Sequence, residues 1–104
     1  GNDTNRILQA AKIVEILRKE QLPVILAGDF NAVDSTRVIK KFDEHFTRSC
    51  VADCEFTIPV INPNKTIDYI VYAPEVKFKV IQHKVISETY ASDHRPVMAI
   101  LQLQ

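Results

Sequence analysis

Polar side chains that can do acid–base or metal chemistry occur at three places in the sequence, each beside a predicted strand. Asp29 and Asn31 follow an apolar run, Asp68 lies early in a second run, and Asp93 with His94 precedes the last one. Because neighbouring strands lie about 5 Å apart in a sheet, their ends can bring these residues onto one patch. Carboxylate and amide oxygens suit Mg²⁺ or Mn²⁺ better than zinc, so we predict a divalent cation at this patch.

The histidine of this set can exchange a proton near neutral pH or, when protonated, hold a developing negative charge. An aspartate on the far ring nitrogen would fix its tautomer, and Asp68 is the natural candidate to orient His94. Structural alternatives exist for each residue taken singly. Asp29 can be a turn or a helix cap, Asp68 can face water at a sheet edge, and the SDH stretch can be a solvated turn before Pro96.

Apolar residues at helical spacing predict two helices. The first runs from about Arg6 to Glu20, with Asp3 or Thr4 as its cap. The second starts after Ser35 as N-cap and runs to about His45.

Four stretches are predicted to form strands. Residues 24–28 form a continuous apolar run between Pro and Gly, typical of a strand covered on both faces. Residues 66–73 form the second, and a turn at residues 73–75 leads to a third. The third starts at Val76 and alternates apolar and polar residues, so we expect a half-exposed antiparallel strand paired with its predecessor. The last runs from about Val97 to Leu103.

Length and composition indicate one small globular domain. The chain has 104 residues, of which 46% are apolar and 25% charged. Its 13 basic and 13 acidic side chains cancel, so net charge gives no support to nucleic-acid binding. No stretch approaches the roughly 18 apolar residues that a transmembrane helix needs. The chain begins with Gly1 rather than Met, from which we expect a processed product or an excised fragment.

Cys50 and Cys54 are separated by three residues, a spacing that is neither a redox nor a zinc signature. We expect two ordinary buried or half-buried thiols, with a disulfide as the main alternative.

Three ordered motifs carry a family resemblance. GDFNA at 28–32, IDYI at 67–70 and SDHRPV at 92–97 resemble the last three motifs of the endonuclease/exonuclease/phosphatase superfamily, which has the DNase I-like fold. The helix that precedes GDFNA, with Arg6 and Gln9, also resembles the corresponding family segment. The match covers nearly all of the chain and corresponds to the C-terminal half of the family domain.

The resemblance implies an α/β fold, namely half of a four-layer α/β/β/α sandwich. We expect residues 1–104 to form part of a single domain, with one mixed sheet and helices on one face. The implied activity is metal-dependent hydrolysis of phosphate esters, of the phosphodiesterase, nuclease or phosphatase type.

Residue roles also follow from the resemblance. Asp29 would position the attacking water or protonate the leaving group, and Asn31 would contact the phosphate or the metal. His94 would contact the phosphate with Asp68 on its ring. The implied ligands of Mg²⁺ or Mn²⁺ are Asp29, Asn31 and Asp93. Arg95 should instead make a structural salt bridge or lie at the surface, because it alternates with His94.

The first half of the family domain has no counterpart in this sequence, including the glutamate that is the principal metal ligand. We therefore expect weak Mg²⁺ binding and weak catalysis from this chain alone. The uncovered sheet face, including Ile25, Ile70 or Val71, and Val97 or Met98, predicts a homodimer. The alternative function is a non-catalytic, self-associating interaction module. The neutral charge favours a small-molecule, lipid or sugar phosphate as substrate over nucleic acid.

Overall fold

The computed structural model describes residues 2–73 and 77–104. Within these residues the chain forms two helices and five strands, which confirms the α/β class. The predicted turn at residues 73–75 and the predicted strand start at Val76 fall largely outside the described residues. The elements are α1 (Asn2–Arg18), β1 (Ile25–Asp29), α2 (Arg37–Asp43), β2 (Thr47–Arg48), β3 (Asp68–Tyr72), β4 (Phe78–Val85) and β5 (Val97–Leu103).

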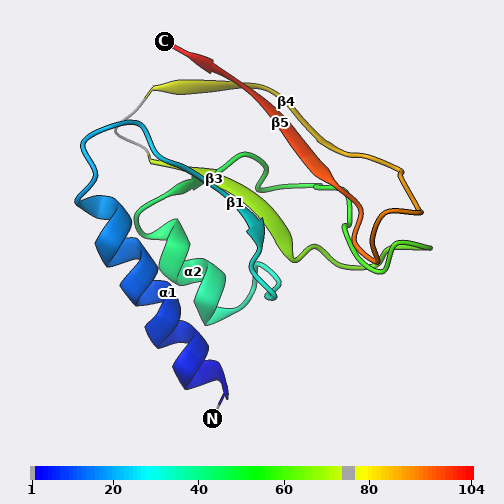
Figure 1. Cartoon of the computed structure of the whole chain (residues 1–104), viewed down its shortest axis with the longest axis horizontal. Helices are drawn as coiled ribbons and strands as arrows, with labels where there is room; N and C mark the ends of the chain where they lie inside the picture. The colour runs from blue at the N-terminus through cyan, green and yellow to red at the C-terminus, as the bar shows by residue number, and fades with distance from the viewer. Residues whose placement is uncertain (1, 74–76) are drawn as a thin grey trace.

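The strands form two separate antiparallel sheets rather than the one mixed sheet that we expected. One sheet has the strand order β1-β3-β2, and the other is the two-stranded β4–β5 hairpin (Figure 1). The prediction that β4 pairs with its predecessor β3 is wrong, because β4 pairs with β5 from Phe78↔Leu103 to Val85↔Val97. Alternation of apolar and polar residues indicates which face of a strand is buried, but does not determine which strand lies beside it.

Both helices cover one face of the β1-β3-β2 sheet, as predicted (Figure 1). Apolar side chains from the two helices meet those of the central strand β3 there, and burial of these side chains is the main stabilising contribution to this half of the chain. The buried cluster comprises Ala10, Val14, Ala32, Val38, Ile39, Phe42, Phe46, Tyr69 and Val71. None of the helices in the described part of the chain is long and apolar enough to cross a membrane.

The predicted helix caps are wrong by small shifts. Because α1 begins at Asn2, both Asp3 and Thr4 lie inside its first turn instead of preceding it. The N-cap of α2 is Thr36, whose Oγ1 accepts a hydrogen bond from the Ile39 N–H at 3.5 Å, and Ser35 lies one residue earlier. Serine and threonine are both good N-caps, so composition could not choose between adjacent positions.

The β4–β5 hairpin covers only part of the other face of the β1-β3-β2 sheet, through contacts such as Tyr72 with Phe78 and Ser49 with His83. The prediction that β1 is covered on both faces is therefore wrong. Ile25 of β1 is 51% exposed. In β3, Val71 is 1% exposed and packs against the helices, so the side chain of the adjacent Ile70 points to the opposite face. Val97 and Met98 are half-buried. The hairpin adds further exposed apolar side chains at Ile81, Ile100 and Leu103.

The two cysteines form a disulfide, so the expectation of two free thiols is wrong. Between them the chain turns through Asp53, which has a φ of 54° in the left-handed region. This turn brings the Cα atoms of Cys50 and Cys54 to 6.0 Å, within the range that a disulfide can bridge. The spacing of the two cysteines in the sequence does not reveal that the backbone reverses direction between them.

Candidate active site

The pairing of β1 with β3 places two carboxylates side by side. The two strands are antiparallel and in register from Ile25↔Tyr72 to Asp29↔Asp68, so both aspartates lie at the same end of the pair. The Phe30 N–H donates to the Ile67 carbonyl at 2.9 Å and extends the ladder by one step. The sheet thus provides a rigid base for the two acidic groups.

His94 reaches this end of the sheet from the loop before β5. Its Nδ1 lies 2.9 and 3.1 Å from the two carboxylate oxygens of Asp68, so the ring donates to that carboxylate. Its Nε2 faces the other two acids, at 3.7 Å from Asp29 Oδ2 and 3.8 Å from Asp93 Oδ1. The hydrogen bond to Asp68 raises the pKa of His94 above its usual value. Partial burial opposes this rise, and the charges of Asp68, Asp29 and Asp93 add to it.

A tight turn after β1 orients the first of these acids. Asn31 adopts a left-handed φ of 52°, which asparagine tolerates better than most residues. Its backbone N–H donates to Asp29 Oδ1 at 2.7 Å, and Arg6 of α1 donates to its carbonyl oxygen. The structure therefore brings Asn31 to the site through its backbone. The D-x-N spacing of the motif corresponds to this side-chain-to-backbone turn.

Tyr69 of β3 holds the same turn in place through its hydroxyl group. The side chain is buried, and its hydroxyl lies 2.8 Å from the Ala32 carbonyl and 3.0 Å from the Thr66 carbonyl. Burial, followed by the charge of Asp34, raises the pKa of Tyr69 to about 12, so the hydroxyl stays protonated as a donor. Tyr69 is thus a buried packing residue that also holds the turn after β1.

An open cleft of about 370 Å³ lies between β1, β3 and the start of β5, and its lining includes Tyr69. Asp29, Asp68 and His94 converge on it despite their separation in sequence. Asp93 stays close to the His94 ring but is mostly solvated, with a side chain that is 84% exposed. An orienting acid, an imidazole and two further carboxylates together form an acid–base site that can also attract a cation.

Comparison with known proteins assigns the family. The model of the endonuclease/exonuclease/phosphatase family matches residues 1–94. The chain belongs to this family. No curated protein matches the sequence.

Several solved structures share the fold of the chain. A functionally unknown conserved protein from Enterococcus faecalis is similar over 98% of this chain at 24% identity, with a TM-score of 0.82. An endonuclease/exonuclease/phosphatase family protein from Bacteroides thetaiotaomicron is similar over 95% of this chain at 26% identity, with a TM-score of 0.77. A mannosyl-6-phosphatase from Bacteroides thetaiotaomicron is similar over 94% at 27% identity, with a TM-score of 0.70. This chain spans 45–46% of each of those chains.

The donor atoms of this endonuclease/exonuclease/phosphatase site fit a divalent cation in part. One ligand atom each from Asp29, Asp68 and His94 lies within 4.8 Å of the others. However, Asp68 is already engaged by the His94 ring, so the carboxylates left to hold a cation are Asp29, which lines the cleft, and Asp93, which lies near His94 Nε2. Two hard carboxylates of this kind suit Mg²⁺ or Mn²⁺ that keeps several water ligands.

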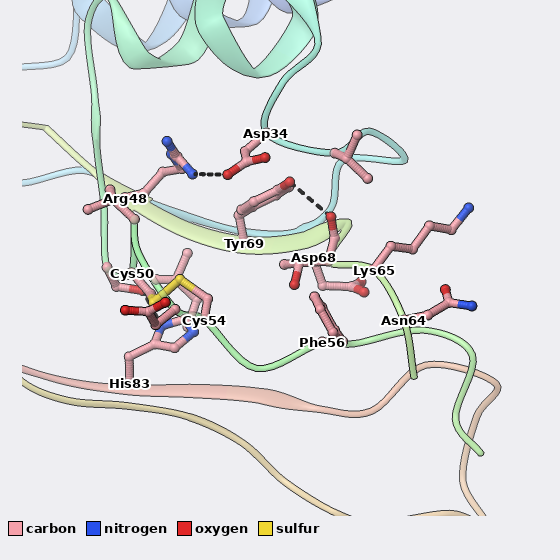
Figure 2. A pocket seen from close by; sticks show the side chains of 16 residues that line it. Asp34, Arg48, Cys50, Cys54, Phe56, Asn64, Lys65, Asp68, Tyr69 and His83 are labelled. Carbon is pink, nitrogen blue, oxygen red and sulfur yellow. Dashed lines mark hydrogen bonds and ion pairs between the residues drawn. A yellow bond between two sulfur atoms is a disulfide. The ribbon is translucent and has the colours of Figure 1, made fainter. Parts of the chain in front are cut away.

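In a second hollow, shown in Figure 2, the arginine and the histidine are already paired. It is lined by the Cys50–Cys54 disulfide, His83, Arg48 and the far side of Asp68. Arg48 forms an ion pair with Asp43 at 2.9 Å and a longer one with Asp34 at 3.7 Å, and His83 Nδ1 lies 2.6 Å from the Ser49 hydroxyl. Burial lowers the pKa of His83 and keeps it neutral. We therefore place the chemistry at His94.

Two structural contacts near His94 were not predicted from the sequence. Arg95 is structural as expected, but its Nε donates to the Val60 carbonyl at 2.8 Å rather than to a carboxylate. Thr57, at the end of a stretch with no clear pattern, is completely buried and bonded to segments on both sides. Its position before Ile58-Pro59 was the only sequence signal, and it indicates a turn without indicating a partner.

Proposed function

We propose that the complete protein containing this chain is a metal-dependent hydrolase of phosphate esters. The observation that carries the proposal is the geometry of His94: Nδ1 is held by Asp68 at 2.9 Å, and Nε2 faces Asp29 and Asp93 across the cleft. An imidazole held in this way, when protonated, presents a directed N–H to a phosphate oxygen, and the hydrogen bond to Asp68 raises the pKa of His94 in favour of that protonated form. Membership of the endonuclease/exonuclease/phosphatase family supports the same reaction class.

Each residue would take a distinct role. Asp29 would accept a proton from the attacking water or give one to the leaving oxygen, and the turn at Asn31 fixes its orientation. His94 would bind the scissile phosphate, and Asp68 would hold the ring tautomer. Asn31 would contact the phosphate or the metal.

Asp29, Asn31 and Asp93 would hold Mg²⁺ or Mn²⁺ together with ligands from the rest of the domain. Such an ion neutralises charge on the phosphate oxygens and stabilises the leaving oxygen. Asp93 is well suited to bind through a water molecule because its side chain is 84% exposed.

Two observations favour a small phosphorylated molecule, such as a sugar phosphate, over nucleic acid. The net charge of the chain is zero, so the chain has no overall positive charge to attract a polyanion. One of the similar solved structures is a mannosyl-6-phosphatase. Phosphate release from mannose 6-phosphate, compared with nicking of duplex DNA, distinguishes the two substrate classes.

The test of the reaction is His94→Ala in the complete protein. We expect Mg²⁺-dependent cleavage to fall about 100-fold or more, with the fold retained by circular dichroism. His45→Ala is the matched control, since His45 lies with Val24 and Ala73 at the opposite end of the β1–β3 pair. Full activity in His94→Ala would refute the assignment.

The alternative is a non-catalytic interaction module. This chain by itself spans less than half of the similar solved structures, and we propose that it binds Mg²⁺ weakly and hydrolyses poorly on its own. Calorimetric titration of the chain and of the complete protein with Mg²⁺ and Mn²⁺ distinguishes the enzyme from the interaction module. Tight stoichiometric binding by the complete protein favours the enzyme, and no binding favours the module.

We also propose that this chain, taken alone, forms a homodimer through its open sheet surface. Ile25, Ile81, Ile100 and Leu103 are all about half exposed or more. Ile25 lies on β1, and the other three lie on the β4–β5 hairpin. Exposed apolar side chains in that number favour association in water.

A further inference from the structure

The hydrogen bond between Asp68 and His94 joins two parts of the fold that no β-ladder connects. Asp68 is the first residue of β3 in the three-stranded sheet, whereas His94 precedes β5 in the separate hairpin. Something other than strand pairing must therefore hold the two residues at 2.9 Å. The question is which contact fixes the two segments relative to each other.

Thr57 lies between the two segments and bonds to both. Its Oγ1 accepts a hydrogen bond from the Ile67 N–H at 3.2 Å, and its carbonyl accepts one from the Arg95 N–H at 2.8 Å. Ile67 is the residue before Asp68, and Arg95 is the residue after His94. One side chain and one carbonyl of a single residue thus connect the backbones on either side of the acid–histidine pair.

Further contacts keep Thr57 itself in place. It has no solvent exposure, and its own N–H donates to the Lys65 carbonyl at 2.9 Å. Three residues further along, the Val60 carbonyl accepts from the Arg95 side chain at 2.8 Å. Arg95 is therefore held by the 57–60 segment through both its backbone and its guanidinium.

We infer that Thr57 is a positioning residue for the proposed reaction, because it sets the distance between Asp68 and His94 across the two sheets. This inference rests on the proposed function. A buried threonine whose hydroxyl only filled space could be replaced by valine, which has nearly the same shape. A threonine that positions the pair could not, because valine leaves the Ile67 N–H without its acceptor.

The test compares three variants of the complete protein. Thr57→Val removes the hydroxyl, and Thr57→Ser keeps it. Thr66→Val makes the same chemical change at a half-buried threonine nearby, whose hydroxyl donates to the Glu55 carbonyl at 3.0 Å. We expect Thr57→Val to lower kcat by about 10- to 100-fold, as a displacement near 1 Å can do, with a much smaller change in KM. Thr57→Ser and Thr66→Val should keep kcat close to that of the wild type.

A second readout does not depend on activity. The Nδ1–H of His94, hydrogen-bonded to a carboxylate, should give a downfield proton resonance in NMR spectra of the wild type and of Thr57→Ser. We expect this resonance to be lost or shifted upfield in Thr57→Val. If no phosphate ester is hydrolysed by the wild type, the proposed function fails, and this resonance still decides the positioning role.

Two results would overturn the inference. One is that Thr57→Val leaves both kcat and the His94 resonance unchanged. The other is that Thr57→Val and Thr66→Val lower kcat equally, or that Thr57→Ser lowers kcat as much as Thr57→Val does. Either form of the second result would indicate that the loop is loosened in general.

Discussion

The helix-covered sheet and the β4–β5 hairpin are built on different principles, and the candidate active site lies where they meet. The β1-β3-β2 sheet packs β3 against both helices and contains the buried cluster of the chain. The hairpin has two strands, no helix against it in Figure 1, and exposed side chains such as Ile100. A hairpin of this kind is only marginally stable by itself.

This contrast separates the roles of the two regions in the site. The well-packed sheet supplies Asp29 and Asp68, and the hairpin region supplies Asp93 and His94. Formation of the site therefore depends on how firmly the hairpin is attached to the sheet. Thr57 and Arg95 form part of that attachment, next to His94 in the sequence.

The largest expected difference between the two regions is the cost of removing an apolar side chain. Ile39 is 1% exposed and Ile100 is 47% exposed. Ile39→Ala should lower the free energy of unfolding by about 2–5 kcal/mol, because it leaves a cavity between the helices and the sheet. Ile100→Ala should lower it by about 0.5 kcal/mol or less. Urea unfolding measures both, and equal losses would mean that the two regions are equally packed.

The disulfide should contribute next. It closes a short loop, with a sequence separation of 4, that leads directly into the segment containing Thr57. A loop of that size should contribute roughly 2 kcal/mol to stability through the unfolded state. Reductant should therefore lower the urea midpoint of the wild type. The double variant Cys50→Ser/Cys54→Ser should start lower and be insensitive to reductant; a midpoint that reductant leaves unchanged in the wild type contradicts the expectation.

Self-association should respond to charge on the open hairpin. We expect the isolated chain to be dimeric at micromolar concentration by light scattering, and Ile100→Lys to raise the dimer dissociation constant roughly tenfold, equivalent to about 1.4 kcal/mol. Gln21→Lys adds the same charge at an exposed polar position outside the hairpin and serves as the control. A clean monomer in the wild type would show that the apolar surface does not drive association.

The smallest expected effect is a pH dependence at the junction. The pKa of His94 is raised in the folded state, chiefly by its hydrogen bond to Asp68. The stabilisation from this pair is therefore fully present below the unfolded-state pKa of about 6.5 and is lost as the pH rises through the folded-state pKa.

Asp68→Asn removes the carboxylate and so measures the stabilisation that the Asp68–His94 pair contributes. The stability difference between wild type and Asp68→Asn, about 1 kcal/mol for one hydrogen bond, should be largest in mildly acidic buffer and should shrink as the pH rises past neutrality. Urea unfolding over a pH series measures it. A difference that grows with pH would mean that the ring is not stabilised in its charged form.

Sequence patterns predicted the local features of the chain because these depend on neighbours in sequence. The helical spacing in residues 6–20 and the apolar run at 97–103 correspond to α1 and β5. Strand partners were not predictable in the same way. The alternation in β4 fits any partner that covers its apolar face, and only the folded chain shows that β5 is that partner.

The acids and the histidine of the site were recognisable because their residue types and motif order are unusual for a structural strand end. Their supports were not. Thr57 lies in a stretch without periodicity, and its importance comes from partners that are 10 and 38 positions away in sequence. Arg6 likewise reaches Asn31 across the α1–β1 connection.

By itself, the sequence determined which chemical groups this protein has and on which elements they lie, because helix and strand formation follow from local spacing and backbone preference. Tertiary structure alone decided that Thr57 bonds to the segments beside Asp68 and His94, that Cys50 is bonded to Cys54, and that the strands divide into two sheets. Those outcomes depend on how distant segments pack, and packing depends on the shape of every side chain at the contact, not on the pattern of any one segment.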